Sequence, residues 1–122
     1  MKYIALIYSD HSNPPAPSTE GFGKMMAGYE TCNTTYRNDG VYIAGDALQP
    51  TTTATTVRVR DGRVETMDGP FAETKEQLGG FYLIDVPDLD AAMRYAAEIP
   101  AARYGTVEIR PIMDTAPLLP GG

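Results

Sequence analysis

Two segments of the chain are apolar on both faces of an extended strand, and they constrain the fold more than any other feature. In the first, Tyr3 to Tyr8, one face carries Tyr, Ala and Ile, while the other carries Ile, Leu and Tyr. In the second, Gly80 to Val86, Phe81 and Leu83 alternate with an equally apolar set. Strands with this pattern require cover on both sides of their sheet.

The rest of the chain predicts only two helices that can give this cover. The first is expected from Ser18 to a stop at Gly40, and the second from a capping Asp88 to Pro100. Their predicted buried stripes are Phe22, Met25, Met26, Tyr29, Cys32 and Tyr36, and Leu89, Ala92, Met93, Ala96 and Ile99. Further strands are expected over residues 41–44 and 106–112.

A β-hairpin is the clearest local prediction. Two alternating segments, residues 55–60 and 63–67, flank Asp61-Gly62, a dipeptide typical of two-residue hairpin turns. This register places Val59 opposite Val64 on one face and Arg58 opposite Glu65 on the other. A polar loop is expected over residues 68–79.

These elements predict an α+β fold: an antiparallel sheet with two helices on one face and an inserted hairpin. Two helices cover only one face of such a sheet, although two strands are apolar on both. A second copy of the chain is the simplest cover for the other face, so we expect a homodimer.

Composition narrows the possible functions. The chain has 122 residues and a net charge of −6, which indicates one domain and disfavours nucleic acids and anionic membranes as partners. One Cys and one His exclude an internal disulfide and a structural zinc site, and we expect no metal and no cofactor. The apolar N-terminal segment is too short for a membrane span or a signal peptide, which favours a cytoplasmic location.

The central part of the sequence resembles a known family. Residues 68–82 read DGPFAETKEQLGGFY, which is similar to the signature of the YCII-related, or DGPF-domain, family. Other blocks resemble that family in the same order: MKY, ATTVR, IPAAR and VEIRP, beginning at residues 1, 54, 99 and 107. The resemblance covers residues 1–113, and we expect residues 114–122 to form a C-terminal tail.

The resemblance implies a ferredoxin-like domain that dimerises sheet to sheet as an α+β barrel. Many family members are encoded next to extracytoplasmic-function sigma factors or fused with them. A related branch carries a His on the first helix facing an Asp, and this pair has been proposed as catalytic. Here the single histidine is His11, in the loop before the helix, and the matching position falls near Gly28 or Tyr29. That chemistry therefore does not carry over.

Asp68 is the first candidate for chemistry. A carboxylate beside Gly-Pro and between Met67 and Phe71 could be partly desolvated, which would suit it to proton transfer. The simpler interpretation is a turn cap. Glu73 and Lys75 follow on the same loop and could hold an anionic ligand, or simply form exposed ion pairs.

Tyrosines and arginines supply the remaining candidates. Tyr82 is the tyrosine predicted to act with Asp68, and Tyr29 could line the same pocket, although such residues more often belong to a core or an interface. Arg58, with Arg60 and Arg63, could bind an anion or an acidic partner.

Two classes of function follow. One is a small-molecule-binding domain, with or without an enzymatic activity that uses Asp68 and Tyr82 inside the barrel. The other is a non-catalytic partner-binding or regulatory module linked to a sigma-factor pathway.

Overall fold

The computed structural model describes residues 1–10 and 20–118. Its helices and strands, in chain order, are β1 (Lys2–Ser9), α1 (Glu20–Asn38), β2 (Tyr42–Ala47), β3 (Thr55–Arg60), β4 (Arg63–Asp68), β5 (Gln77–Asp85), α2 (Leu89–Ala96) and β6 (Thr106–Pro111). Three short 3-10 turns are η1 (Thr51–Thr53), η2 (Pro100–Arg103) and η3 (Ala116–Leu118). The predicted helix start at Ser18 and the loop with His11 lie outside the described residues.

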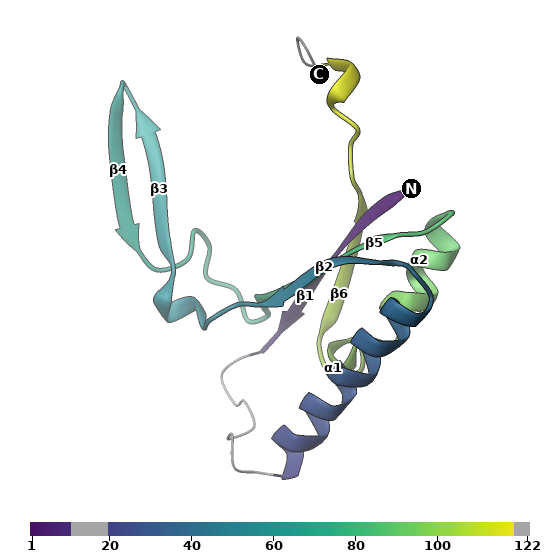
Figure 1. Cartoon of the computed structure of the whole chain (residues 1–122). Helices are drawn as coiled ribbons and strands as arrows, with labels where there is room; N and C mark the ends of the chain where they lie inside the picture. Colours follow the sequence, from purple (N-terminus) through teal and green to yellow (C-terminus); the bar gives the residue numbers. More distant parts are fainter. Residues whose placement is uncertain (11–19, 119–122) are drawn as a thin grey trace.

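The main sheet has four antiparallel strands in the order β2-β5-β1-β6. Both α1 and α2 lie against the same face of this sheet (Figure 1). Each helix connects two strands that are separated by one other strand in the sheet. This is a ferredoxin-like α+β fold, and it confirms the fold class predicted from the sequence.

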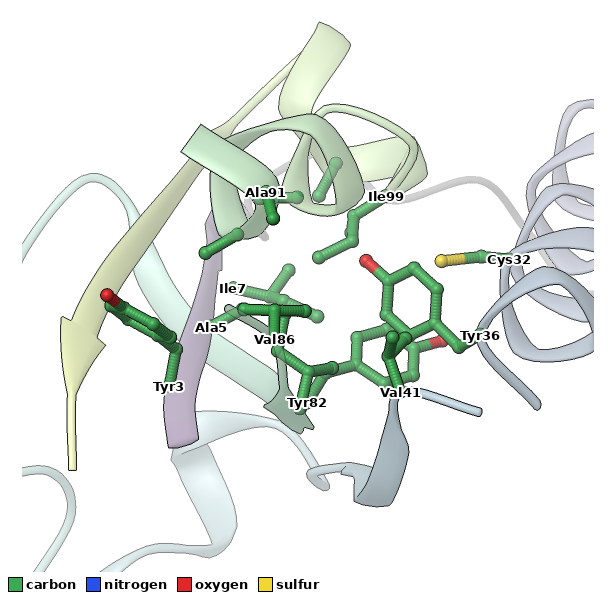
Figure 2. Packing of buried hydrophobic residues seen from close by; sticks show 14 residues of the cluster. Tyr3, Ala5, Ile7, Cys32, Tyr36, Val41, Tyr82, Val86, Ala91 and Ile99 are labelled. Carbon is green, nitrogen blue, oxygen red and sulfur yellow. The ribbon is translucent and has the colours of Figure 1, made fainter. Parts of the chain in front are cut away.

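The hydrophobic core lies between this face and the helices. Tyr3, Ala5 and Ile7 of β1, together with Tyr82 and Ile84 of β5, are each at most 7% exposed. Figure 2 shows these strand residues packed against side chains from the helices and their flanking loops, including Cys32, Tyr36, Ala91 and Ile99.

The helices bury narrower faces than the sequence predicts. In α2, Leu89 and Met93 are 48% and 47% exposed, because the helix packs on the sheet through small residues. These residues are Ala91, Ala92 and Ala96. In α1 only Cys32 and Tyr36 are fully buried, and Met26, near the N-terminal end, is 47% exposed. The N-terminal half of α1 extends past the sheet in Figure 1, so its apolar residues meet little of the core.

The opposite face of the sheet is open. Ile4 pairs with Leu83 and Leu6 with Phe81, and all four side chains are half-buried by their neighbours in the sheet. We call these four residues the open face. No helix of the described residues lies over it (Figure 1). The two-sided apolar pattern of β1 and β5 is therefore satisfied on only one side within a single chain.

β2 and β5 extend furthest beyond their predicted bounds. β2 continues to Ala47 because it pairs with β5 as far as Gly80, and β5 begins at Gln77 because it pairs with β1 as far as Ser9. Gly80 permits this close pairing. It is buried, and a Cβ at this position would lie 2.9 Å from the backbone oxygen of Asp46.

The hairpin β3–β4 forms a separate two-stranded sheet with the predicted register. Asp61 and Gly62 both have positive φ, 52° and 75°, as two-residue hairpin turns of this type require. At the foot of the hairpin, Gly69 N donates to Ala54 O at 2.7 Å and Thr56 Oγ1 donates to Gly69 O at 2.8 Å. These bonds fix the hairpin where it leaves the body of the domain, and Figure 1 shows it standing away from that body.

Candidate functional site

A polar groove lies where three segments meet at one end of the main sheet. These segments are the end of β1, the η1 turn and the loop that leads into β5. The groove has a volume of about 430 Å³ and is lined by Asp10, Pro50, Thr51, Thr52, Thr74, Lys75 and Gln77. Among the sequence-predicted site residues, Lys75 is the one that lines it.

Strand pairing explains why these distant segments meet. Ser9 pairs with Gln77, so the chain leaving β1 at Asp10 runs beside the chain entering β5. Thr51 Oγ1 donates to Gln77 Oε1 at 3.1 Å, which holds the η1 turn against the same loop. Thr106 Oγ1 donates to Glu76 Oε2 at 2.8 Å and ties the loop to β6. The position of Lys75 is thus set by contacts on both sides of it.

Lys75 is the cation of the groove. It is exposed, and no salt bridge to its ammonium group occurs within residues 1–10 and 20–118. Thr51, Thr52, Thr74 and the carboxylate of Asp10 line the same groove. The Thr51 hydroxyl donates to Gln77 Oε1, and the Thr74 hydroxyl donates to the backbone oxygen of Glu76. With one ammonium group and one carboxylate, the groove is suited to a small polar molecule that carries an anionic group for Lys75 and hydroxyl or amino groups for Asp10.

Asp68 and Glu73 lie outside the lining of this groove. Asp68 ends β4 opposite Thr55, and its side chain is exposed. Its carboxylate accepts no hydrogen bond and forms no ion pair within the described part of the chain. Glu73 is likewise exposed. A single chain therefore gives Asp68 neither the partial burial nor the turn-capping bond considered from the sequence.

Arg58 contacts the loop after the hairpin rather than its cross-strand neighbour. Its guanidinium carbon lies 5.2 Å from the centre of the Phe71 ring, a cation–π contact. Glu65 is opposite Arg58 in the register, but the pair forms no salt bridge within 4.0 Å among the described residues. Arg58 therefore braces Phe71 at the base of the hairpin.

Tyr82 lies in the core on the helix-covered face (Figure 2), away from the open face and the hairpin. Its hydroxyl donates to Asn33 Oδ1 at 2.5 Å, and burial raises the pKa of Tyr82 well above its usual range. The structure thus does not bring Tyr82 and Asp68 together.

Tyr29 also lies on the helix side, on α1. Burial is the main cause that raises the pKa of Tyr29, and the nearby Tyr104 raises this pKa further. Tyr29 is partly buried, and a phenol with a raised pKa stays protonated at neutral pH, which suits packing and hydrogen bonding better than proton transfer.

Sequence reasoning missed most of the groove. Asp10, Thr51, Thr52, Thr74 and Gln77 come from segments far apart in the chain. The run of threonines at residues 51–53 was a usable signal, because small hydroxyl residues after a strand and a proline often form a turn with exposed donors.

A second groove, of about 300 Å³, runs between α2 and β6. Its lining is Met93, Ala96, Ala97, Ala102, Gly105, Thr106, Val107 and Ile109. No charged side chain lines it, so it offers no group for acid–base chemistry.

The chain is similar to known proteins along most of its length. The model of the YCII-related domain matches residues 1–116. The chain belongs to the YCII-related family. An uncharacterized protein of Rhizobium meliloti (strain 1021) is 41% identical to this YCII-related chain over 114 residues, which cover 92% of each protein. Among the described residues, no helix is long and apolar enough to cross a membrane.

The fold is expected not to depend on a bound metal ion. The described residues contain no group of three or more His, Cys, Asp or Glu side chains placed to hold a metal ion. We expect the melting temperature of the protein to be unchanged on addition of EDTA, measured by circular dichroism. A lower melting temperature in EDTA that recovers with added metal would contradict this prediction.

Proposed function

We propose that this YCII-related protein is a homodimeric domain that binds a small anionic molecule in the groove around Lys75. The observation that carries the proposal is an ammonium group without an acidic partner among the described residues, in a chain whose net charge is −6. Most surfaces of such a chain repel anions. The anionic group of a ligand would bind to the Lys75 ammonium group, and hydroxyl or amino groups of the same ligand would meet the Asp10 carboxylate on the groove wall.

Binding, rather than catalysis, is the proposal. Proton transfer by Asp68 would need a partner or a desolvated site, and a single chain gives its exposed carboxylate neither. The groove around Lys75 can instead bind a ligand through the ammonium group of Lys75 and the polar groups beside it.

The open face supports the homodimer. Ile4, Leu6, Phe81 and Leu83 form an apolar surface across the two central strands, and the helices occupy the other side. A self-complementary surface of this kind is closed by a two-fold axis, which brings the same patch of a second copy against it.

Lys75→Ala tests the binding site. We expect inorganic phosphate or succinate, titrated at low ionic strength and followed by amide NMR shifts around residues 74–77, to bind at least about tenfold more weakly to the variant. The matched control is Lys24→Ala, since Lys24 is an exposed lysine that pairs with Glu20 on α1. Equal weakening by both variants would point to net charge alone. Binding that is unaffected by Lys75→Ala would reject the site.

A second function is favoured by a separate observation. The hairpin exposes several large apolar side chains, as expected of a surface that meets another protein. A partner-binding or regulatory role, including one in a sigma-factor pathway, would use this surface. Co-purification of a sigma factor with the intact protein, but not with a hairpin variant, would support that role over anion binding.

A further inference from the structure

The β3–β4 hairpin has one apolar face and one charged face. Val57, Val59 and Val64 share the apolar side, which we call the valine face, and Val59 pairs directly with Val64. These three side chains are 60%, 58% and 70% exposed in a single chain. The opposite side carries Arg58 and Glu65. Such alternation is typical of strands with one covered face.

The valine face lacks that cover among the described residues. Isolated two-stranded hairpins are marginally stable in water, and they normally gain stability by packing against another layer. β-branched residues favour strand conformation, yet three exposed valines on one side add an apolar surface that water disfavours. With one exposed apolar face, the hairpin therefore resembles an element that packs against another protein surface more than a solvated loop.

The position of the hairpin indicates its partner. In Figure 1 it projects from the body on the side away from α1 and α2, which is the side of the open face. Its strands have six residues each, which corresponds to about 20 Å at the usual rise. Stacked sheets lie about 10 Å apart. A second copy stacked on the open face would thus lie within reach of the hairpin.

The arginines of the hairpin share one of its faces with Glu65. Arg60 and Arg63 are directly opposite each other next to the turn, and like charges in this arrangement repel. The stretch from Arg58 to Glu65 contains three arginines and two acidic residues, which gives 3 − 2 = +1 in a chain of net charge −6. In this register the arginines lie on the face opposite the valine face, so they can stay hydrated when the valine face is covered.

We propose that the hairpin is an intersubunit arm whose valine face packs against a second copy of the chain docked on the open face. Two-fold symmetry then places one arm from each protomer on the other, so a single association covers both apolar surfaces. The proposal rests on the homodimer of the proposed function but not on anion binding. It predicts that the valine face contributes to dimer affinity separately from the open face.

The test compares two variants of the full chain. Val57→Thr, Val59→Thr and Val64→Thr together keep β-branched side chains and strand propensity but remove apolar surface. We expect the dimer Kd from sedimentation equilibrium to rise by about a hundredfold, with an unchanged circular dichroism spectrum. The matched control, Arg58→Thr with Glu65→Thr, alters the opposite face without a change in net charge, and its Kd should stay within about threefold of the parent.

Hydrogen exchange gives an independent measurement on the unaltered protein. Amide exchange in residues 55–68 should slow as protein concentration rises through the dimer Kd, because docking suppresses opening of the hairpin. In the valine variant this concentration dependence should disappear. Phosphate titration of the same variants separates the two proposals, since the groove around Lys75 should bind equally well in both.

Four results would overturn the arm. The valine variant could dimerise with the parental Kd, or hairpin exchange could be independent of concentration. The valine variant could also lose a different protein while it keeps its dimer, which would assign the valine face to that protein. A protein that stays monomeric at all concentrations would likewise exclude the arm, whereas phosphate binding would still decide the groove.

Discussion

Leu83→Asp is expected to convert the protein into a folded monomer. Leu83 lies on a central strand of the open face, opposite Ile4, and is half-buried in a single chain. An aspartate there can remain hydrated in the monomer. In a sheet-to-sheet dimer its carboxylate would be buried against apolar side chains, which costs several kcal/mol. The dimer should weaken by at least about a hundredfold, as measured by sedimentation velocity over a range of concentrations.

The control for this experiment is Leu89→Asp. Leu89 is 48% exposed at the start of α2, on the other side of the sheet, and an acidic residue is favourable near a helix N-terminus. This variant should remain as dimeric as the parent. If both variants are dimers, the open face is not the interface. If Leu83→Asp unfolds the protein, Leu6→Ser, a milder change on the same face, should still lower the dimer affinity.

Local signals made some parts of the fold predictable from the sequence. The hairpin was predicted with its register because a two-residue turn fixes which residues face each other, and this depends on Asp61-Gly62 alone. The cap at Asp88 was also predicted, and its side chain accepts a hydrogen bond from Ala91 N at 2.9 Å. Such features are determined by a few adjacent residues.

Features that depend on packing were predicted less well. Leu89 and Met93 fit the helical periodicity but remain exposed, because α2 approaches the sheet through its alanines. Periodicity indicates an apolar stripe but does not say how closely a helix can approach. In α1 the predicted stripe extends beyond the sheet, which only the three-dimensional arrangement reveals.

The candidate site was the least predictable part. Lys75 was selected from one loop, but its neighbours in the groove come from β1 and the η1 turn. These segments meet because of the strand order β2-β5-β1-β6, which brings the ends of β1 and β5 side by side. Tyr82 was selected for its chemistry, yet its position in β5 turns it toward α1. The residues of such a site can be predicted only once the strand order is known.

The tyrosines of the core lead to a prediction about alkaline pH. Tyr36 is fully buried, and its ring packs edge-on against the rings of Tyr82 and Tyr95, with centroid distances of 5.0 and 5.4 Å. Tyr36 donates to the backbone oxygen of Tyr95 at 2.6 Å. Burial is the main cause that raises the pKa of Tyr36 and that of Tyr82 well above the usual range.

Ionisation of these two phenols should favour the unfolded chain. In the unfolded chain tyrosine ionises near a pKa of about 10, while the buried phenols remain protonated in the folded state. Stability from both groups is thus fully present below pH ~10 and is lost as the pH rises above it. Each phenol lowers the free energy of unfolding by about 1.4 kcal/mol per pH unit in this range, or about 2.8 kcal/mol for the pair.

The free energy of unfolding should therefore fall by roughly 5 kcal/mol between pH ~10 and ~12, a large part of the stability of an ordinary domain. Urea unfolding followed by circular dichroism at several pH values measures this slope. Tyr36→Phe combined with Tyr82→Phe is the informative variant. It loses two hydrogen bonds, to the Tyr95 carbonyl and to Asn33, so it should be about 2 kcal/mol less stable at neutral pH.

Above pH ~10 the same variant should lose stability more slowly than the parent, because two of the groups that ionise on unfolding are gone. The two effects have opposite signs, so a general weakening of the core cannot imitate them. Other groups that titrate in this range are common to both proteins and cancel in the comparison. An equal alkaline slope in the double variant and the parent would show that Tyr36 and Tyr82 ionise within the folded protein, against the burial seen in the core.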